Sequence, residues 1–234
     1  IADRAMFHAD NAYRLPAARI HSRRLKTHTV SNTAFRGFGG PQGMVAIERA
    51  MDRIAFELGI DPLDVRRRNF YPAGGDAVTP YHMPVTDSII GEIVDELEKT
   101  SDYRARREAV RAFNADSPVL KKGIALTPVK FGISFTTSHL NQAGALVHVY
   151  KDGSVQLNHG GTEMGQGLFT KVAQVVAEEF QIDVERIRIT GTSTGKVPNT
   201  SATAASSGTD LNGMAAQAAA RTIRDRLVAY AVSR

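Results

Sequence analysis

The segment from Phe35 to Gly43 (FRGFGGPQG) constrains the fold of this chain more than any other stretch. Its glycines allow the main chain to adopt positive φ angles and to approach a ligand closely. Arg36 adds a permanent charge with five hydrogen-bond donors in a fixed fork. Phe38 adds a flat face on which a planar ring can stack. The combination predicts a loop that lays main chain against a ligand, although a tight turn with Phe35 and Phe38 in the core would give the same pattern.

Two further runs of small residues lie downstream, at His159–Gly167 (HGGTEMGQG) and Asn199–Gly208 (NTSATAASSG). The first follows a predicted strand and precedes a predicted helix, where main-chain N–H groups and the helix dipole favour an anion. A nucleotide-binding P-loop is not expected, because Gln166-Gly167 rather than Lys-Ser or Lys-Thr follows Gly165. Three such loops together indicate one large polar cofactor with planar and anionic parts.

Composition excludes several classes of protein. The chain has 234 residues, enough for one large or two small domains, and a net charge of +5. No nucleic-acid partner is expected, because the arginines at 66–68 and at 104–107 fall in helical segments mixed with acids, without interleaved aromatics, and are therefore expected on solvated helix faces. With no cysteine, this chain offers neither a disulfide nor a ligand for an iron–sulfur cluster. No stretch is apolar enough for a membrane helix, so we expect a cytoplasmic protein, and the start at Ile1 suggests one piece of a longer polypeptide.

The N-terminal part, residues 1–118, reads as helical. Apolar residues recur at helical spacing from Met44 to Leu58, between a proline and a glycine that favour a helix start and stop. Asp61-Pro62 predicts an N-cap and first turn for a short helix to about Asn69. The spacing also predicts a helix capped by Ser88 and a charged helix from Tyr103 to Phe113.

The C-terminal part, residues 119–234, reads as α+β, with Ser117-Pro118 as the boundary. Alternation predicts a strand from Gly123 to Thr136, and Asp152-Gly153 predicts a hairpin turn. The remaining expected elements are the two hairpin strands at 145–150 and 155–158, a helix at 168–180, a strand at 187–190 and a helix from Leu211 onward. The predicted fold class is therefore α+β, with mixed sheets and packed helices.

Together with RAMFHADN at 4–11, KFGISFT at 130–136 and LNQAGA at 140–145, the three runs resemble the molybdenum-cofactor subunit of xanthine dehydrogenases, in the molybdenum hydroxylase family. The resemblance covers nearly the whole chain in one register. It implies the molybdopterin-binding domain fold, a molybdenum–molybdopterin cofactor, and FAD and 2Fe-2S centres on partner domains or subunits of an oligomeric enzyme.

The resemblance implies four substrate-binding residues. Arg4 aligns with an arginine that binds a purine carbonyl oxygen, where a guanidinium can stabilise developing negative charge. Phe38 would stack on the substrate ring, Phe135 would meet it edge-on, and Thr136 would form a hydrogen bond to it. From the residues alone, Arg4 reads equally as an ordinary surface arginine.

The cofactor-binding residues are also implied by the resemblance. Gly165 and Gln166 would contact the pterin, and the main chain at Arg36 and Ala205 would lie beside molybdenum. Further contacts to the pterin or its phosphate are expected from Thr203, Ser206 and Ser207. Without the resemblance, the run at His159–Gly167 could equally be a turn that serves only packing, and the run at Asn199–Gly208 would read as a hydroxyl-rich surface loop. The seven histidines show no metal-ligand spacing, and the metal is expected on the dithiolene sulfurs of the cofactor.

The implied reaction is the hydroxylation of purines, from hypoxanthine or xanthine to urate, with water as the oxygen source. Electrons would pass through iron–sulfur centres and FAD to NAD. The general base is a glutamate expected downstream of this chain, so no catalytic residue is assigned within it; Glu163 is a weaker candidate for a base. The alternatives are an aldehyde or N-heterocycle oxidoreductase, an inactive fragment, or a non-catalytic module that binds nucleotides or nucleic acid.

Overall fold

The computed structural model describes the whole chain except residues 76, 133–137 and 197–198. The chain divides into two compact units, Ile1–Gly132 and Ile133–Arg234. Among the described residues, no helix is both long enough and apolar enough to cross a membrane.

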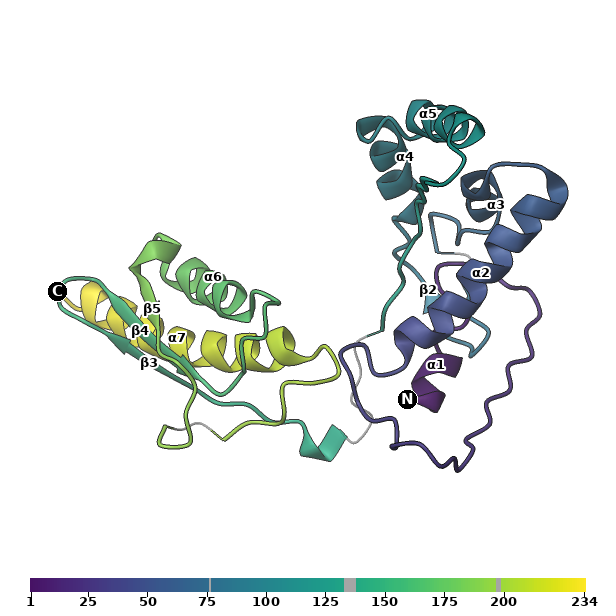
Figure 1. Ribbon diagram of the computed structural model, residues 1–234. Helices are drawn as coiled ribbons and strands as arrows, with labels where there is room; N and C mark the ends of the chain where they lie inside the picture. Colours follow the sequence, from purple (N-terminus) through teal and green to yellow (C-terminus); the bar gives the residue numbers. More distant parts are fainter. Residues whose placement is uncertain (76, 133–137, 197–198) are drawn as a thin grey trace. The chain divides into compact units, whose positions relative to one another are not determined.

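The first unit is helical, with one two-stranded antiparallel sheet (Figure 1). Its helix from 40 to 58 confirms the helix predicted from Met44 to Leu58 and begins earlier, within the glycine run. The predicted cap at Asp61 is also confirmed, because its carboxylate accepts a hydrogen bond from the Leu63 amide (2.9 Å) at the start of the next helix. The predicted cap at Ser88 is wrong, because its hydroxyl donates to the Tyr71 carbonyl (3.2 Å) instead. The elements of this unit are α1 (Ala2–Met6), α2 (Gly40–Leu58), α3 (Pro62–Arg68), β1 (Ala77–Val78), β2 (Pro84–Val85), α4 (Ile90–Thr100) and α5 (Tyr103–Asp116).

Two apolar clusters hold the first unit together. One joins α2 and α3 around Tyr13, Met51 and Val65, and the other joins α3, α4 and α5 around Leu63 and Tyr103. The expectation that the arginine run at 66–68 lies on a solvated face is wrong for its first member, Arg66, which is 1% exposed.

The segment 119–132 belongs to the first unit, beyond the boundary expected at Ser117-Pro118. The predicted strand from Gly123 is wrong over the described residues 123–132, and its remainder lies in residues that the structure does not describe. Side chains replace a neighbouring strand as hydrogen-bonding partners: the Asn11 amide donates to the Pro128 carbonyl (2.9 Å), and Arg107 donates to the Ile124 carbonyl (3.2 Å). The chain is therefore held in place without joining a sheet.

The second unit contains a mixed three-stranded sheet with two helices packed against it (Figure 1). The Asp-Gly hairpin is confirmed, with Gly153 at φ 79° and the Ser154 amide donating to the Asp152 carboxylate (2.9 Å). The elements are a short 3₁₀ helix (Ser138–Leu140), β3 (Ala145–Val149), β4 (Val155–His159), α6 (Leu168–Phe180), a second 3₁₀ helix (Val184–Arg186), β5 (Ile187–Ile189) and α7 (Gly208–Val232).

The sheet and helices of this unit share one core. β3 pairs antiparallel with β4, and β4 pairs parallel with β5 after the crossover through α6. Val147, Leu157 and Ile187 of the sheet pack against Val172 and Val176 of α6 in this core. These helices, strands and mixed pairing confirm the α+β prediction.

Candidate functional site

Arg4, the expected substrate-binding arginine, is half-buried on α1. Its Nη2 donates a hydrogen bond to the Gly132 carbonyl, and its guanidinium lies over the Phe131 ring, 5.0 Å from the ring centroid. Arg4 is therefore not an ordinary surface arginine, since the hydrogen bond and the ring contact together orient its guanidinium.

The glycine run that leads into α2 lies against α1 (Figure 1). A Cβ on Gly39, whose φ is 110°, would come within 2.1 Å of the Ile1 carbonyl oxygen. A Cβ on Gly43 would come equally close, 2.1 Å, to the Ala5 carbonyl oxygen. These positions require glycine because the main chains of α1 and α2 touch. This contact brings the Arg36–Phe38 loop, which precedes α2, to the same end of the unit as Arg4.

The Phe35 and Phe38 rings are not in the core. Phe38 has φ 49° and is 48% exposed, Phe35 is 83% exposed, and Arg36 is also exposed. A phenylalanine held in the left-handed region is uncommon and indicates a constrained turn. The loop thus presents an aromatic face and a guanidinium to the outside, as a ligand-binding loop requires. The other two expected substrate residues, Phe135 and Thr136, lie outside the described residues.

In the second glycine run, the anion that binds at the start of α6 is a side chain of the run itself, the Glu163 carboxylate. The Glu163 carboxylate accepts hydrogen bonds from the amides of Gly165 (2.8 Å), Gly167 (3.0 Å) and Phe169 (3.1 Å). The hydrogen bond from Phe169 leads the main-chain contacts that lower the pKa of Glu163. A carboxylate with a lowered pKa is a poor general base, so its geometry is that of a loop-closing residue.

Gln166 also helps to fold this loop. Its amide nitrogen donates to the Thr162 carbonyl (2.8 Å), and its amide oxygen accepts from the Met164 amide (2.5 Å). Gly165 has φ 87°, and a Cβ placed on it would meet no atom within 4 Å, so its surroundings are open. Cofactor contacts by Gly165 and Gln166 remain predictions.

The third loop lies directly beside the second. The Thr162 amide donates to the Thr203 hydroxyl (2.8 Å), and the Ser207 hydroxyl donates to the Ala204 carbonyl (3.0 Å). Ala205 and Ser206 both adopt left-handed backbone, with φ of 55° and 61°. Within the described part of the chain, no hydrogen bond is recorded for the amides of these two residues. The loop thus places the main-chain N–H groups of Ala205 and Ser206 directly before the N-terminal end of α7.

This donor set suits an oxygen-rich, anionic cofactor. Hydroxyl and main-chain N–H donors converge beside two helix N-termini, which attract negative charge. Behind the loops lies His159, which is 1% exposed and accepts a hydrogen bond from the Gly161 amide (3.1 Å) through Nδ1. Burial lowers the pKa of His159, so this supporting ring is neutral and adds no charge. The residues present thus fit molybdopterin as predicted.

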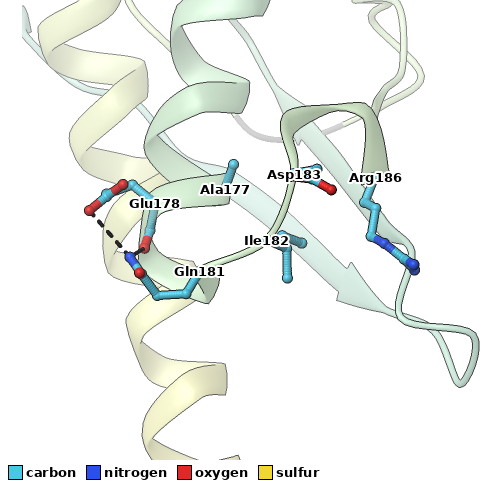
Figure 2. Close-up of a pocket in the computed structure, with 6 residues that line it drawn as sticks. All are labelled: Ala177, Glu178, Gln181, Ile182, Asp183 and Arg186. Atoms are coloured by element: carbon cyan, nitrogen blue, oxygen red, sulfur yellow. Dashed lines mark hydrogen bonds between the residues drawn. The ribbon is translucent and has the colours of Figure 1, made fainter.

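Two cavities of the second unit differ in their position relative to these loops: one lies away from them, and the other is lined partly by their residues. One, of about 450 Å³, lies beyond the C-terminal end of α6, where Gln181 donates to the Glu178 carbonyl (2.7 Å), and contains no predicted site residue (Figure 2). Another, of about 530 Å³, is lined by Asn158, His159, Gly160, Thr192, Ser193, Thr194, Lys196, Asn199 and Thr200. Across the described residues, no group of three histidine, aspartate or glutamate side chains is placed to hold a metal ion.

Sequence reasoning missed four residues that support Arg4. His8, Asp10, Asn11 and Lys130 form hydrogen bonds that hold the segment 128–132 against the turns after α1. Their only sequence signal was their place inside the two motifs RAMFHADN and KFGISFT, which give no information about contacts between them.

Comparison with known proteins gives the family. Two models described as molybdopterin cofactor-binding domain match residues 1–70 and 96–233. Over 227 residues, or 97% of this chain, the chain is 50% identical to the xanthine dehydrogenase/oxidase of Mus musculus and 48% identical to the xanthine dehydrogenase of Dictyostelium discoideum. It spans 17% of the length of each of these curated relatives.

A solved structure shares the fold. Quinoline 2-oxidoreductase from Pseudomonas putida 86 superposes with a TM-score of 0.72 at 21% identity, covering 95% of this chain and 29% of that one. The resemblance inferred from sequence is thus confirmed, and the chain belongs to the family of molybdopterin cofactor-binding domains.

Proposed function

We propose that this chain works as the molybdenum-cofactor part of a xanthine dehydrogenase that hydroxylates hypoxanthine and xanthine to urate, with water as the source of oxygen. The observation that carries the proposal is the identity of about one residue in two, over 97% of the chain, with relatives that bear this name. The orientation of Arg4 in the first unit supports it.

The proposed cofactor site uses the loops at the starts of α6 and α7. The amides of Ala205 and Ser206 and the hydroxyl of Thr203 would donate to oxygen atoms of the cofactor, and the Ser207 hydroxyl would do so on exchanging its hydrogen bond to the Ala204 carbonyl. Gly165 and Gln166 would contact the pterin, and the main chain at Arg36 would approach the metal. When bound, molybdenum–molybdopterin supplies the redox centre that accepts two electrons from the substrate.

The proposed substrate site belongs to Arg4 and Phe38. The Arg4 guanidinium would donate a hydrogen bond to a purine carbonyl oxygen and stabilise negative charge that develops on the ring. The exposed ring of Phe38 would stack on the heterocycle, with Phe135 and Thr136 completing the slot. The chain would thus bind and orient the substrate, while the general base is a glutamate outside this sequence.

Further parts of the proposal concern the surroundings of the chain. FAD and 2Fe-2S centres on partner domains or subunits would carry electrons to NAD in an oligomeric, cytoplasmic enzyme of purine catabolism. Binding of nucleic acid is disfavoured, because each basic segment has arginines that are already paired with carboxylates: Arg66 with Glu48 (2.8 Å), and Arg107 with Asp61 (3.0 Å). Such pairs leave little charge for phosphates.

The first test is to purify the protein from its source and to measure molybdenum, pterin, intact mass and turnover of xanthine, an aldehyde and quinoline. Stoichiometric molybdenum and pterin with preferential xanthine turnover are expected. Preference for the aldehyde or quinoline would identify another molybdenum hydroxylase, and protein without molybdenum or pterin would contradict the proposal.

The substrate assignment is tested by Arg4→Met in the same enzyme. Loss of a donor aimed at developing charge should lower kcat/KM for xanthine by about 100-fold or more, without a similar loss for the aldehyde. Arg53→Met is the matched control, because Arg53 is exposed on α2 and pairs only with Glu57 of the same helix among the described residues. Unchanged xanthine turnover in Arg4→Met would contradict a purine-binding role for Arg4.

A further inference from the structure

We infer that His8 is a positioning residue for Arg4: its two ring nitrogens fix both the main chain of Arg4 and the peptide group that holds the Arg4 guanidinium. The inference rests on the proposed function, since it concerns how the proposed substrate arginine is held. It adds a specificity-determining residue that itself touches neither substrate nor cofactor.

The hydrogen bonds around His8 form a closed circuit. His8 Nδ1 lies 2.8 Å from the Arg4 carbonyl oxygen, and the Gly132 amide lies 3.2 Å from His8 Nε2. The Gly132 carbonyl then accepts a hydrogen bond from Arg4 Nη2. Moving the imidazole would therefore shift both ends of Arg4, its main chain directly and its guanidinium through Gly132.

The same contacts select one protonation state of the ring. The Gly132 amide can only donate, so Nε2 must accept, and the Arg4 carbonyl can only accept, so Nδ1 must carry the proton. The circuit therefore requires the neutral imidazole with its proton on Nδ1. A second proton would place two N–H donors face to face at Nε2 and break the contact with Gly132.

Packing prevents the ring from adopting another position. His8 is 4% exposed and lies against the Phe131 ring at a centroid distance of 4.8 Å. Gly40 packs against both rings: a Cβ added to it would come within 2.6 Å of the Phe131 ring and 3.5 Å of the His8 ring, so only glycine fits there. The Arg4 guanidinium covers Phe131 as well, so the three side chains Arg4, His8 and Phe131 are mutually constrained.

The segment that carries Gly132 is anchored independently on its N-terminal side. The Lys130 amide donates to the Asn11 side chain (3.0 Å), and the Lys130 ammonium pairs with the buried Asp10 carboxylate (2.5 Å). This anchoring holds the segment up to Lys130, while the Gly132 peptide itself is held by His8 at its amide and by Arg4 at its carbonyl.

The charges that face His8 come from Arg4, Asp10 and Lys130. Burial is the main cause that lowers the pKa of His8, and the positive charges of Arg4 and Lys130 act in the same direction. The hydrogen bond to the Arg4 carbonyl and the negative charge of Asp10 oppose this lowering of the pKa without cancelling it. The neutral ring is therefore present at neutral pH, and the circuit is lost only in acid.

The test compares His8→Phe, His8→Asn and His8→Gln in the complete enzyme, with molybdenum and pterin measured for each variant. Phenylalanine keeps a ring beside Phe131 but removes both hydrogen bonds, and misplacement of Arg4 should lower kcat/KM for xanthine by about 100-fold. Asparagine restores a donor at the Nδ1 position and glutamine an acceptor at the Nε2 position, so each should recover part of the activity. His148→Phe, on the exposed side of β3, is the matched control.

A double-mutant cycle separates positioning from a structural role. Combined with Arg4→Met, the His8→Phe change should lower kcat/KM for xanthine by less than about twofold further, because the arginine that it positions is already gone. Turnover of an aldehyde, which has no purine carbonyl, should change little in His8→Phe. Additive losses in the cycle, or equal losses with the aldehyde, would overturn the inference.

A crystal structure of the His8→Phe enzyme gives a readout that does not depend on turnover. The Arg4 guanidinium should leave the Gly132 carbonyl; if it stays there, the inference is wrong. The two proposals fail differently: full xanthine turnover in Arg4→Met contradicts the substrate assignment, whereas loss in Arg4→Met with full activity in His8→Phe contradicts this inference alone.

Discussion

Glu48 of α2 and Arg66 of α3 form an ion pair inside the first unit, with Arg66 Nε 2.8 Å from Glu48 Oε2. The other Glu48 oxygen accepts hydrogen bonds from the Tyr13 hydroxyl (2.6 Å) and the Asn11 amide (2.9 Å), and Arg66 also pairs with Asp52 (2.8 Å). Burial, followed by the hydrogen bond to Glu48, raises the pKa of Tyr13, which stays protonated. The network joins α2, α3 and the turn at Asn11. Asn11 in turn binds the segment 128–132, whose Gly132 carbonyl accepts the hydrogen bond from Arg4.

Removing Arg66 should destabilise the first unit strongly. Arg66→Ala leaves the Glu48 carboxylate without its charge partner, which in buried pairs costs about 3–5 kcal/mol. The exposed control Arg53→Ala, in an i,i+4 pair with Glu57, should cost about 0.5 kcal/mol or less. Urea unfolding, with hydrogen exchange of α2 to report on this unit, measures both. Similar losses in the two variants would contradict a buried role for the network.

Close contact between α1 and α2 makes Gly43 a sensitive position. Gly43→Ala adds a methyl group 2.1 Å from the Ala5 carbonyl oxygen, so the two helices must separate, at a cost of about 2 kcal/mol or more. Gly91→Ala, in α4 where nothing lies within 4 Å of the added Cβ, should stabilise the protein by about 0.5–1 kcal/mol. Thermal unfolding of the pair decides the matter, and a neutral Gly43→Ala would show that the helices are not in contact.

The sequence predicted those elements whose signals are local. The helix at 168–180 was predicted residue for residue, and the hairpin at Asp152-Gly153 and the cap at Asp61 follow from short motifs with known turn and capping chemistry. For the site, the glycines of the Phe35–Gly43 run indicated close approach of the main chain, and the structure shows such an approach to α1; the contact with a ligand stays a prediction. Each of these features depends on residues within one or two turns of each other.

The sequence did not predict features that depend on distant polar partners. Arg66 looked like a surface residue because its partner Glu48 lies on another helix. The alternation after Gly123 predicted a strand, because the pattern does not reveal that the side chain of Asn11, far away in the sequence, binds the main chain there. His8 was missed for the same reason, since its partner Gly132 is more than one hundred residues away in the chain. Periodicity reports burial along one element and carries no information on such pairs.

Glu163 should act in folding the loop before α6 rather than as a base. Glu163→Gln keeps one acceptor oxygen for the amides of Gly165, Gly167 and Phe169 but replaces the other oxygen by an NH₂ donor and removes the charge that suits the helix N-terminus, so Tm should fall. Turnover of the complete enzyme per bound molybdenum should fall by less than about tenfold, since loss of a general base costs about 10²–10⁴. A fall within that larger range, with unchanged Tm, would show that Glu163 is catalytic.

Stability should fall as the pH is lowered, because two buried histidines are neutral in the folded chain. Burial lowers the pKa of both His8 and His159 from the ordinary value of 6.5. Below that value the unfolded chain binds protons that the folded chain does not, so the free energy of unfolding decreases with decreasing pH.

The expected result is a free energy of unfolding that changes little from about pH 8 to about pH 7 and falls from there to about pH 5. His8→Asn should remove part of this slope for the first unit and His159→Asn for the second, because asparagine does not titrate. The exposed His148→Asn should leave the slope unchanged. Urea unfolding at each pH, with hydrogen exchange to assign the loss to one unit, measures the slopes. Stability that rises toward acid, or a slope that survives both substitutions in full, would mean that these rings already accept a proton in the folded chain.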